Sequence, residues 1–309
     1  MQSQIQNVSF SGHETFPFRY GWLKKGVDAV TKNEGQHFFT RDDAMVDLGV
    51  GKNMVQSIRH WCLSANLIRP LDNRYSGYKT TDLGRLIFEV PAFDPYFEDP
   101  ATLWLIHWQI ASNASVSTTW YWLFNLWHSV DFTKAQLFDE ITKWIEKNEL
   151  KPVTINTLTR DIDTCVRTYV HSRTTQATIS EDSFNCPLVE LGLISELDEG
   201  RSYQIARAEH RSLPNEILLY ALSTFWNSRY PEANSISLEK ITYDIGSPGK
   251  IFKLDGESLA RRLEAASKTT NGTFFLEEKN GLKQLYRREV FPPEYWLDLY
   301  YKDEEVVTG

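Results

Sequence analysis

Apolar residues recur at three- and four-residue steps on both sides of a glycine-containing turn in the first quarter of the chain. The first predicted helix begins at about Arg41, where Thr40 followed three residues later by Asp43 resembles a capping box. We expect one side of this helix to be apolar, and that side contains Ala44, Met45 and Leu48.

The turn Gly49-Val50-Gly51 separates this helix from a second one, because glycine adopts backbone conformations that other residues avoid. The buried stripe of the second helix is predicted to contain Val55, Ile58, Cys62 and Ala65. At about 100° per residue, the polar residues fall on the opposite, exposed face. They are Asn53, Gln56, Ser57 and His60, flanked by Lys52 and Arg59.

A short hairpin is predicted after the second helix, with Asp72-Asn73 as its turn and residues 74–79 as its second arm. Helix, glycine turn, helix and hairpin is the order of a winged helix-turn-helix. Residues 81–88 add a closing amphipathic segment. We therefore predict a first domain over residues 1–90, made of an N-terminal segment and this winged helix.

Residues 91–232 are predicted to form a helical, aromatic-rich domain, since six of the ten tryptophans lie between Trp104 and Trp144. Aromatic side chains dominate buried cores. A base-stacking surface for single strands also uses aromatics but needs interleaved cations. No Lys or Arg lies between Trp104 and Trp127, so we expect a core there. Further amphipathic helices are predicted at 133–148 and 158–171.

Residues 233–309 are predicted to form a second winged-helix-like unit. Asn280-Gly281 is the strongest short hairpin signal in the chain. The predicted elements are short helices at 237–245 and 248–254, a longer helix at 257–268, and strands at 273–277 and 284–288. The whole chain is thus expected to be mainly α with small β-wings.

The formal net charge of -8 would ordinarily argue against nucleic-acid binding. However, residues 1–90 carry 11 Lys and Arg against 9 Asp and Glu, a net charge of +2. We therefore expect any nucleic-acid site near the N-terminus or on a local basic patch. The uncharged stretch between Asp99 and Asp131 contains many polar residues, which favours a buried helix over a membrane span.

The three cysteines have no paired ligand spacing and cannot all pair with one another, so neither a disulfide framework nor a zinc knuckle is expected. The first residues have no basic segment followed by an apolar one, so no secretory signal is expected. A reducing cytoplasm fits these features best.

The exposed face of the second helix has the residue types that read base edges, since Asn and Gln bind adenine and Arg and Lys bind guanine. Winged helices also serve as protein-interaction modules, and that alternative stays open. The candidate DNA-binding residues are Lys52, Asn53, Gln56, Ser57, Arg59 and His60 on the helix, with Arg74, Tyr75 and Lys79 on the wing.

His13, Glu14 and Arg19 are the candidate catalytic residues, because a His beside a Glu with a nearby Arg suits proton transfer or phosphate binding. The alternative is that His13 and Glu14 brace the following aromatic helix, since adjacent side chains usually point in different directions. No cofactor is expected to bind tightly, but a nickase would use Mg²⁺ or another divalent metal, whose ligands are unknown. No GxxxxGK loop occurs, so ATP use by this chain alone is not expected.

Four segments carry a resemblance to a known family: SFSGHETFPFRYGWL (9–23), LGVGKNMV (48–55), EDPATLWL (98–105) and TTWYW (118–122). They resemble the SspB-like family, a bacterial family of unknown function encoded beside DNA phosphorothioation and phage-defence genes. The resemblance is dense over about residues 9–125 and weaker beyond.

The resemblance implies a subunit that nicks DNA or docks on it in a phosphorothioate-modification and antiviral defence system. Its partners would be double-stranded DNA, a cysteine desulfurase, an SspC-type ATPase and an SspD-type sulfurtransferase. It supplies no catalytic residues. We therefore expect a cytoplasmic DNA-binding protein, with metal-dependent nicking of one strand left open. The alternative is a non-catalytic winged-helix transcriptional regulator or an assembly scaffold.

Overall fold

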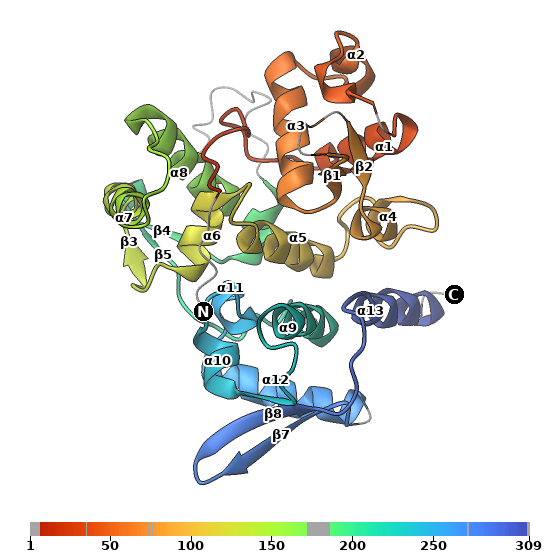
Figure 1. Ribbon diagram of the computed structural model, residues 1–309, viewed down its shortest axis with the longest axis vertical. Coiled ribbons are helices and arrows are strands. Elements are labelled where there is room, and N and C mark those ends of the chain that lie inside the picture. The colour runs from red at the N-terminus through yellow and green to blue at the C-terminus, as the bar shows by residue number, and fades with distance from the viewer. Residues whose placement is uncertain are drawn as a thin grey trace. The chain divides into compact units, whose positions relative to one another are not determined.

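The computed structural model describes residues 7–34, 36–72, 75, 77–171, 186–270 and 272–307, with side chains up to residue 302 (Figure 1). The chain divides into two compact units. Unit 1 consists of residues up to Leu123 together with Trp127–Ile205, and unit 2 consists of Phe124–Leu126 and the residues from Ala206 onward. Both units are mostly helical with small antiparallel sheets, which confirms the mainly α class.

The first part of unit 1 has the predicted order of two helices around a glycine turn, followed by two strands. The strands are antiparallel, with Ile68 opposite Thr80. The elements are α1 (Trp22–Lys32), η1 (Phe38–Thr40), α2 (Ala44–Leu48), α3 (Lys52–Ser64), β1 (Ile68–Pro70), β2 (Tyr78–Thr80) and α4 (Asp82–Phe88).

The predicted start of the first helix is wrong, because α2 begins at Ala44 and has no side-chain cap. Thr40 belongs to the short helix η1, and its hydroxyl donates to the carbonyl of His37 (2.9 Å). The guanidinium of Arg41 binds the carboxylate of Asp43. Both expected capping side chains thus have other partners.

The rest of unit 1 contains the aromatic-rich helices and a three-stranded sheet. Four of the six clustered tryptophans, Trp104, Trp108, Trp120 and Trp122, are buried, which confirms the predicted core. The elements are α5 (Pro100–Ser112), α6 (Thr118–Asn125), β3 (Asp131–Phe132), α7 (Lys134–Lys147), α8 (Ile155–Tyr169), η3 (Pro187–Leu191), β4 (Ser195–Leu197), η4 (Asp198–Gly200) and β5 (Ser202–Gln204). The predicted helices at 133–148 and 158–171 correspond to α7 and α8.

Unit 2 contains the helices and the hairpin predicted in the last third of the chain. Asn280 (φ 54°) and Gly281 (φ 76°) form the tight turn of that hairpin, as their sequence indicates. The elements are α9 (Asn215–Arg229), β6 (Ser235–Ser237), α10 (Leu238–Tyr243), α11 (Pro248–Ile251), α12 (Gly256–Thr269), β7 (Phe274–Lys279), β8 (Leu282–Arg287) and α13 (Glu294–Val307).

The two three-stranded sheets share one topology. Their strand orders are β3-β5-β4 and β6-β8-β7, so in each sheet the last strand lies between the first two. In each sheet, helices lie along the chain between the first strand and the other two strands. The predicted limit at residue 232 falls between α9 and β6, within unit 2, and the three-part division stays a prediction.

Candidate nucleic-acid interface

The turn between α2 and α3 is built on Gly49. This residue has a φ of 63°, in the left-handed region that side chains disfavour, whereas Gly51 has an ordinary φ of -69°. The amide of Val50 donates to the carbonyl of Met45 (3.1 Å), and Lys25 Nζ donates to the carbonyl of Leu48 (2.9 Å). These bonds hold the end of α2 and fix the direction in which α3 starts.

The first turn of α3 is the most accessible part of the predicted DNA-reading face. Lys52 and Asn53 are exposed, and the N-cap residue Gly51 has no side chain to accept a hydrogen bond from the first amide groups of the helix. Gln56 is half-buried, and its amide nitrogen donates to the carbonyl of Phe39 (2.8 Å). Arg59 is half-buried, and its Nε has no hydrogen-bond partner among the described atoms.

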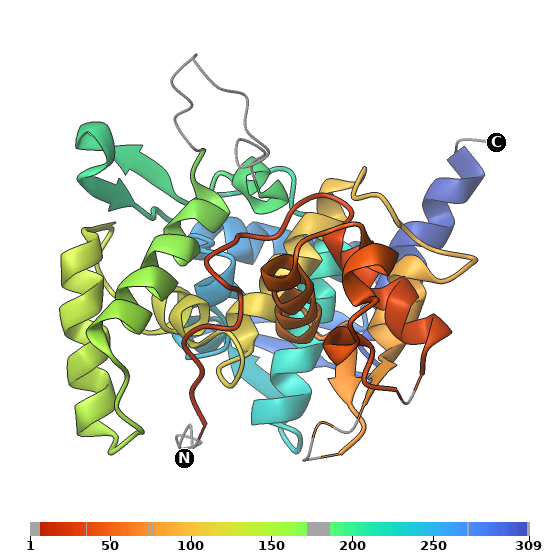
Figure 2. The ribbon, with the colours of Figure 1, turned by 90° about the horizontal axis from the view of Figure 1, so that it is seen from above.

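Ser57 and His60 are buried, so the prediction that they lie on the exposed face of α3 is wrong. The N-terminal segment, residues 7–21, covers this side of the helix (Figure 2). Trp61 Nε1 donates to the carbonyl of Phe16 (2.9 Å), and a Cβ on Gly12 would lie 2.8 Å from Nδ1 of His60. The helical period identified the polar side of α3 but not the segment that covers it.

The wing residues are only partly described. Tyr75 is exposed and Lys79 is half-buried, whereas Arg74 lies outside the described residues. Exposed acidic residues lie on and before α2, namely Asp42, Asp43 and Asp47. These carboxylates would repel a phosphate beside α2, so exposed cations such as Lys52 and Lys25 would have to offset them.

His13 forms a buried pair with Asp161 of α8. Its Nδ1 accepts a hydrogen bond from the amide of Thr15 (3.0 Å), so the ring proton lies on Nε2, which donates to Asp161 Oδ1 (2.6 Å). The hydroxyl of Thr119 donates to the other oxygen of Asp161. This network ties the N-terminal segment to α6 and α8.

A second histidine packs against this network. The rings of His13 and His60 are 5.5 Å apart. Burial is the main cause that lowers the pKa of His60 well below 6.5, and the neighbouring His13 and Arg59 lower it further. His60 is therefore neutral at pH 7.

The three candidate catalytic residues do not converge. His13 is buried, Glu14 is exposed with a φ of 48°, and the guanidinium of Arg19 lies over the rings of Phe16 (5.9 Å) and Trp22 (5.4 Å). Within the described part of the chain, no group of three or more His, Cys, Asp or Glu residues is placed to hold a metal ion.

Asp161 is the partner that sequence reasoning missed. It lies between Leu158 and Ile162 on the buried side of α8, where an acidic residue is unusual. The sequence does carry one signal for this role, which is an ionisable residue within an apolar stripe. Such a group needs a hydrogen-bond partner when it is buried.

The fold and this surface define a mainly helical protein with a helix–turn–helix–hairpin arrangement near its N-terminus. No helix among the described residues is long and apolar enough to cross a membrane. Residues 10–301 match the family described as "Protein of unknown function (DUF4007)", and the chain belongs to this family.

Two solved structures resemble the whole chain. The SspB crystal structure is 29% identical, with a TM-score of 0.83, and the match covers 97% of this chain and 89% of that one. The magnesium ion-bound SspB crystal structure is 28% identical, also with a TM-score of 0.83, covering 95% of this chain and 88% of that one. The expected resemblance to SspB is thus confirmed. A search of curated proteins gives no significant match.

Proposed function

We propose that this protein is a DNA-binding subunit of a bacterial DNA phosphorothioate-modification and defence system. The observation that carries the proposal is the exposed first turn of α3, with Lys52 and Asn53, in a helix that the β1–β2 hairpin follows in the chain. In a winged helix-turn-helix, the residues at the start of this helix enter the major groove. The likeness to SspB supports the same assignment.

In this proposal, Asn53 reads a base edge, and Lys52 binds either a guanine or a phosphate. The uncapped amides at the start of α3 are suited to a backbone phosphate, because a helix N-terminus attracts anions. Tyr75 and Lys79 contact the backbone from the wing. Gln56 and Arg59 contribute less than the sequence predicts, because both are half-buried.

The partners in this proposal are double-stranded DNA, an SspC-type ATPase and an SspD-type sulfurtransferase. The DNA-binding subunit would place the modification machinery on its target, while the ATPase and the sulfurtransferase act beside it. This assignment rests on the resemblance to SspB, because the described surface identifies no protein partner.

Substitutions at the start of α3 test the proposal. Lys52→Ala should weaken binding to every duplex, because it removes a sequence-independent phosphate contact. Asn53→Ala should lose about 1 to 3 kcal/mol on the specific sequence and little on random DNA. Fluorescence anisotropy with labelled duplexes measures both effects, and Lys147→Ala on α7 is a matched control for one exposed positive charge. Equal affinities for the wild type and a Lys52→Ala, Asn53→Ala double variant would refute the proposal.

Nicking of one strand needs a separate test, because the alternative is a non-catalytic regulator or an assembly scaffold. Mg²⁺ is the ion to use, given the likeness to a magnesium-bound SspB structure. We assign no residue to a metal ion, because the described residues form no such group. Conversion of supercoiled plasmid to open circles by the purified protein would establish a nickase. Intact plasmid in every preparation would favour the alternative.

A further inference from the structure

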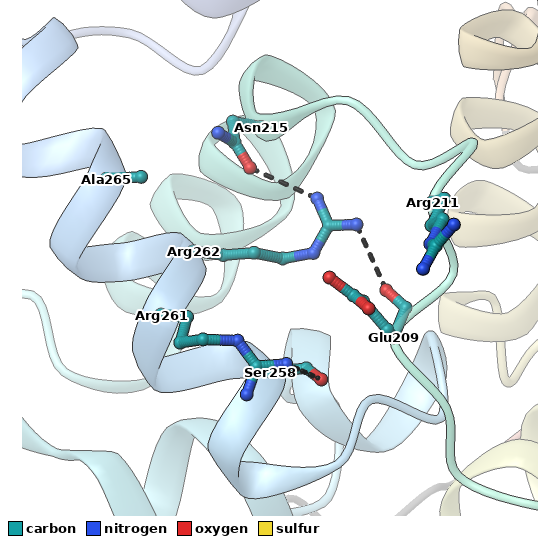
Figure 3. Close-up of a pocket in the computed structure, with 7 residues that line it drawn as sticks. All are labelled: Glu209, Arg211, Asn215, Ser258, Arg261, Arg262 and Ala265. Carbon is teal, nitrogen blue, oxygen red and sulfur yellow. Dashed lines mark hydrogen bonds between the residues drawn. The ribbon is translucent and has the colours of Figure 1, made fainter.

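A polar pocket lies on the surface of unit 2, where α12 meets the start of α9 and the loop before it (Figure 3). Its volume is about 360 Å³. Three arginines face a single glutamate among the lining residues, which are Glu209, Arg211, Asn215, Ser258, Arg261, Arg262 and Ala265. This concentration of guanidinium groups contrasts with the net negative charge of the chain.

Arg262 forms the fixed wall of the pocket. Its Nη1 donates to the carbonyl of Leu213 (2.7 Å) and to Asn215 Oδ1 (3.1 Å), and its Nη2 donates to the carbonyls of Glu209 (3.0 Å) and His210 (2.7 Å). These four acceptors are neutral, and the carboxylate of Glu209 attracts the guanidinium without accepting any of these hydrogen bonds. Burial is the main cause that lowers the pKa of Arg262. Attraction to Glu209 raises this pKa in part, and repulsion from Arg261 lowers it further, so the net effect is a lowering. A bound anion would offset this cost.

The other two arginines have donors to spare. Arg211 is exposed and forms no hydrogen bond or ion pair among the described residues. Arg261 donates to Ser258 Oγ (2.9 Å) and pairs with Glu257 (3.1 Å), an exposed pair of the kind that water weakens. Asn215 accepts from Arg262 through Oδ1, which leaves its amide nitrogen to donate.

The donor set fits a phosphate group, because the planar guanidinium matches phosphate oxygens with two parallel hydrogen bonds. The pocket has no aromatic side chain on which a base could stack, and Ala265 is its only apolar lining residue. A free nucleotide would therefore gain little beyond its phosphates. A phosphate of a DNA backbone passing over an open surface suits the pocket better.

The place of the pocket in the fold agrees with this ligand. In unit 2, α12 follows a shorter helix and precedes the β7–β8 hairpin, as α3 follows α2 and precedes the β1–β2 hairpin in unit 1. We propose that Arg211, Arg261 and Arg262 bind a backbone phosphate of DNA and give the protein a second DNA contact on unit 2. This inference rests on the proposed DNA-binding function.

Arg211→Gln and Arg261→Gln test the site, and Lys302→Gln, an exposed lysine of unit 2 outside the pocket, is the control. Arg211 has no hydrogen-bond or ion-pair partner among the described residues, so its variant should fold normally, as thermal melting can verify. Each pocket variant should bind a labelled duplex about threefold to tenfold more weakly and reduce the slope of log K against log salt by about 1. The control should stay within about twofold of wild type.

Two further measurements separate the outcomes. If Lys52→Gln weakens DNA binding but both pocket variants match wild type, the second contact is wrong and the proposed function stands. If the wild type binds no duplex, both the second DNA contact and the proposed function are wrong. Titration with ATP tests the other phosphate source. Tight ATP binding that the pocket variants lose, without any change in DNA affinity, would assign the pocket to a free nucleotide and overturn the DNA contact.

Discussion

His13 and Glu14 are neighbours in the chain but have opposite surroundings, since His13 is buried against Asp161 and Glu14 is exposed. We expect His13→Ala to lower the free energy of unfolding by about 3 to 5 kcal/mol, because it leaves the carboxyl group of Asp161 buried without its partner. Glu14→Gln should change it by less than about 0.5 kcal/mol, as for most exposed sites. Chemical denaturation of the two variants measures the difference.

The same pair of variants separates a bracing role from a catalytic one. If this pair braces the fold and takes no part in catalysis, Glu14→Gln should keep both the fold and any plasmid nicking of the wild type. A loss of nicking of about 100-fold or more in Glu14→Gln, with an unchanged melting temperature, would instead identify it as a general acid or base.

His60 should make unit 1 sensitive to acid. Its pKa is lowered in the folded state, so below about pH 6.5 the unfolded chain binds a proton that the folded chain does not. The stability from this residue is therefore complete above pH 6.5 and is lost as the pH falls below it, by at most about 1.4 kcal/mol per pH unit.

The His60→Gln variant isolates this contribution, since glutamine keeps a polar group near Ser64 but does not titrate. Unfolding free energies measured from pH 7 to pH 5 should decrease more steeply for the wild type than for the variant. Parallel curves would show that His60 is not the titrating group.

At the scale of the element, the turn before α3 gives a matched pair of glycines. A Cβ would have open space at both Gly49 and Gly51, but only Gly49 has a positive φ. Gly49→Ala should therefore cost about 1 kcal/mol or more through backbone strain alone, and Gly51→Ala should cost a few tenths at most. DNA affinity should fall further than stability in Gly49→Ala, because the turn sets the direction of α3.

Thermal melting and anisotropy on the two glycine variants check this prediction. Equal melting temperatures for both variants would mean that the left-handed conformation of Gly49 is not needed. A larger loss in Gly51→Ala would place the conformational constraint at the start of α3 instead.

Elements whose signal lies in their own residues were predictable from the sequence. The Asn280-Gly281 hairpin and α3 are examples, because turn chemistry and helical period are local properties. The sheet of β3, β4 and β5 was missed, since strands of two or three residues are too short to show an alternating pattern. The burial of Ser57 and His60 was missed because the segment that covers them is distant in sequence.

At the scale of the whole molecule, the net charge of -8 limits how strongly DNA can be held. If only Lys25, Lys52 and Lys79 bind phosphates, the slope of log K against log salt should be about -2.7, from a contribution of about -0.9 per phosphate. If the arginine pocket of unit 2 binds one further phosphate, it should approach about -3.6.

Affinities measured at several salt concentrations distinguish these two values without any substitution. A slope close to zero would contradict both, because it would mean that binding involves no phosphate contacts. The same measurement also shows the effect of the exposed acidic residues around α2. Their repulsion of DNA would lower the affinity most at low salt, where charges are least screened.

The bond between His13 and Asp161 joins positions 148 residues apart, which sets an order of events during synthesis. A ribosome adds about 5 to 20 residues per second, so roughly 7 to 30 s pass between the two. During that interval Trp61 lacks Trp120, its ring neighbour from α6, until α6 has been made. Until then the newly made helices around Trp61 expose an aromatic surface, and a ribosome-bound chain that ends before α6 should bind chaperones more strongly than one that includes it.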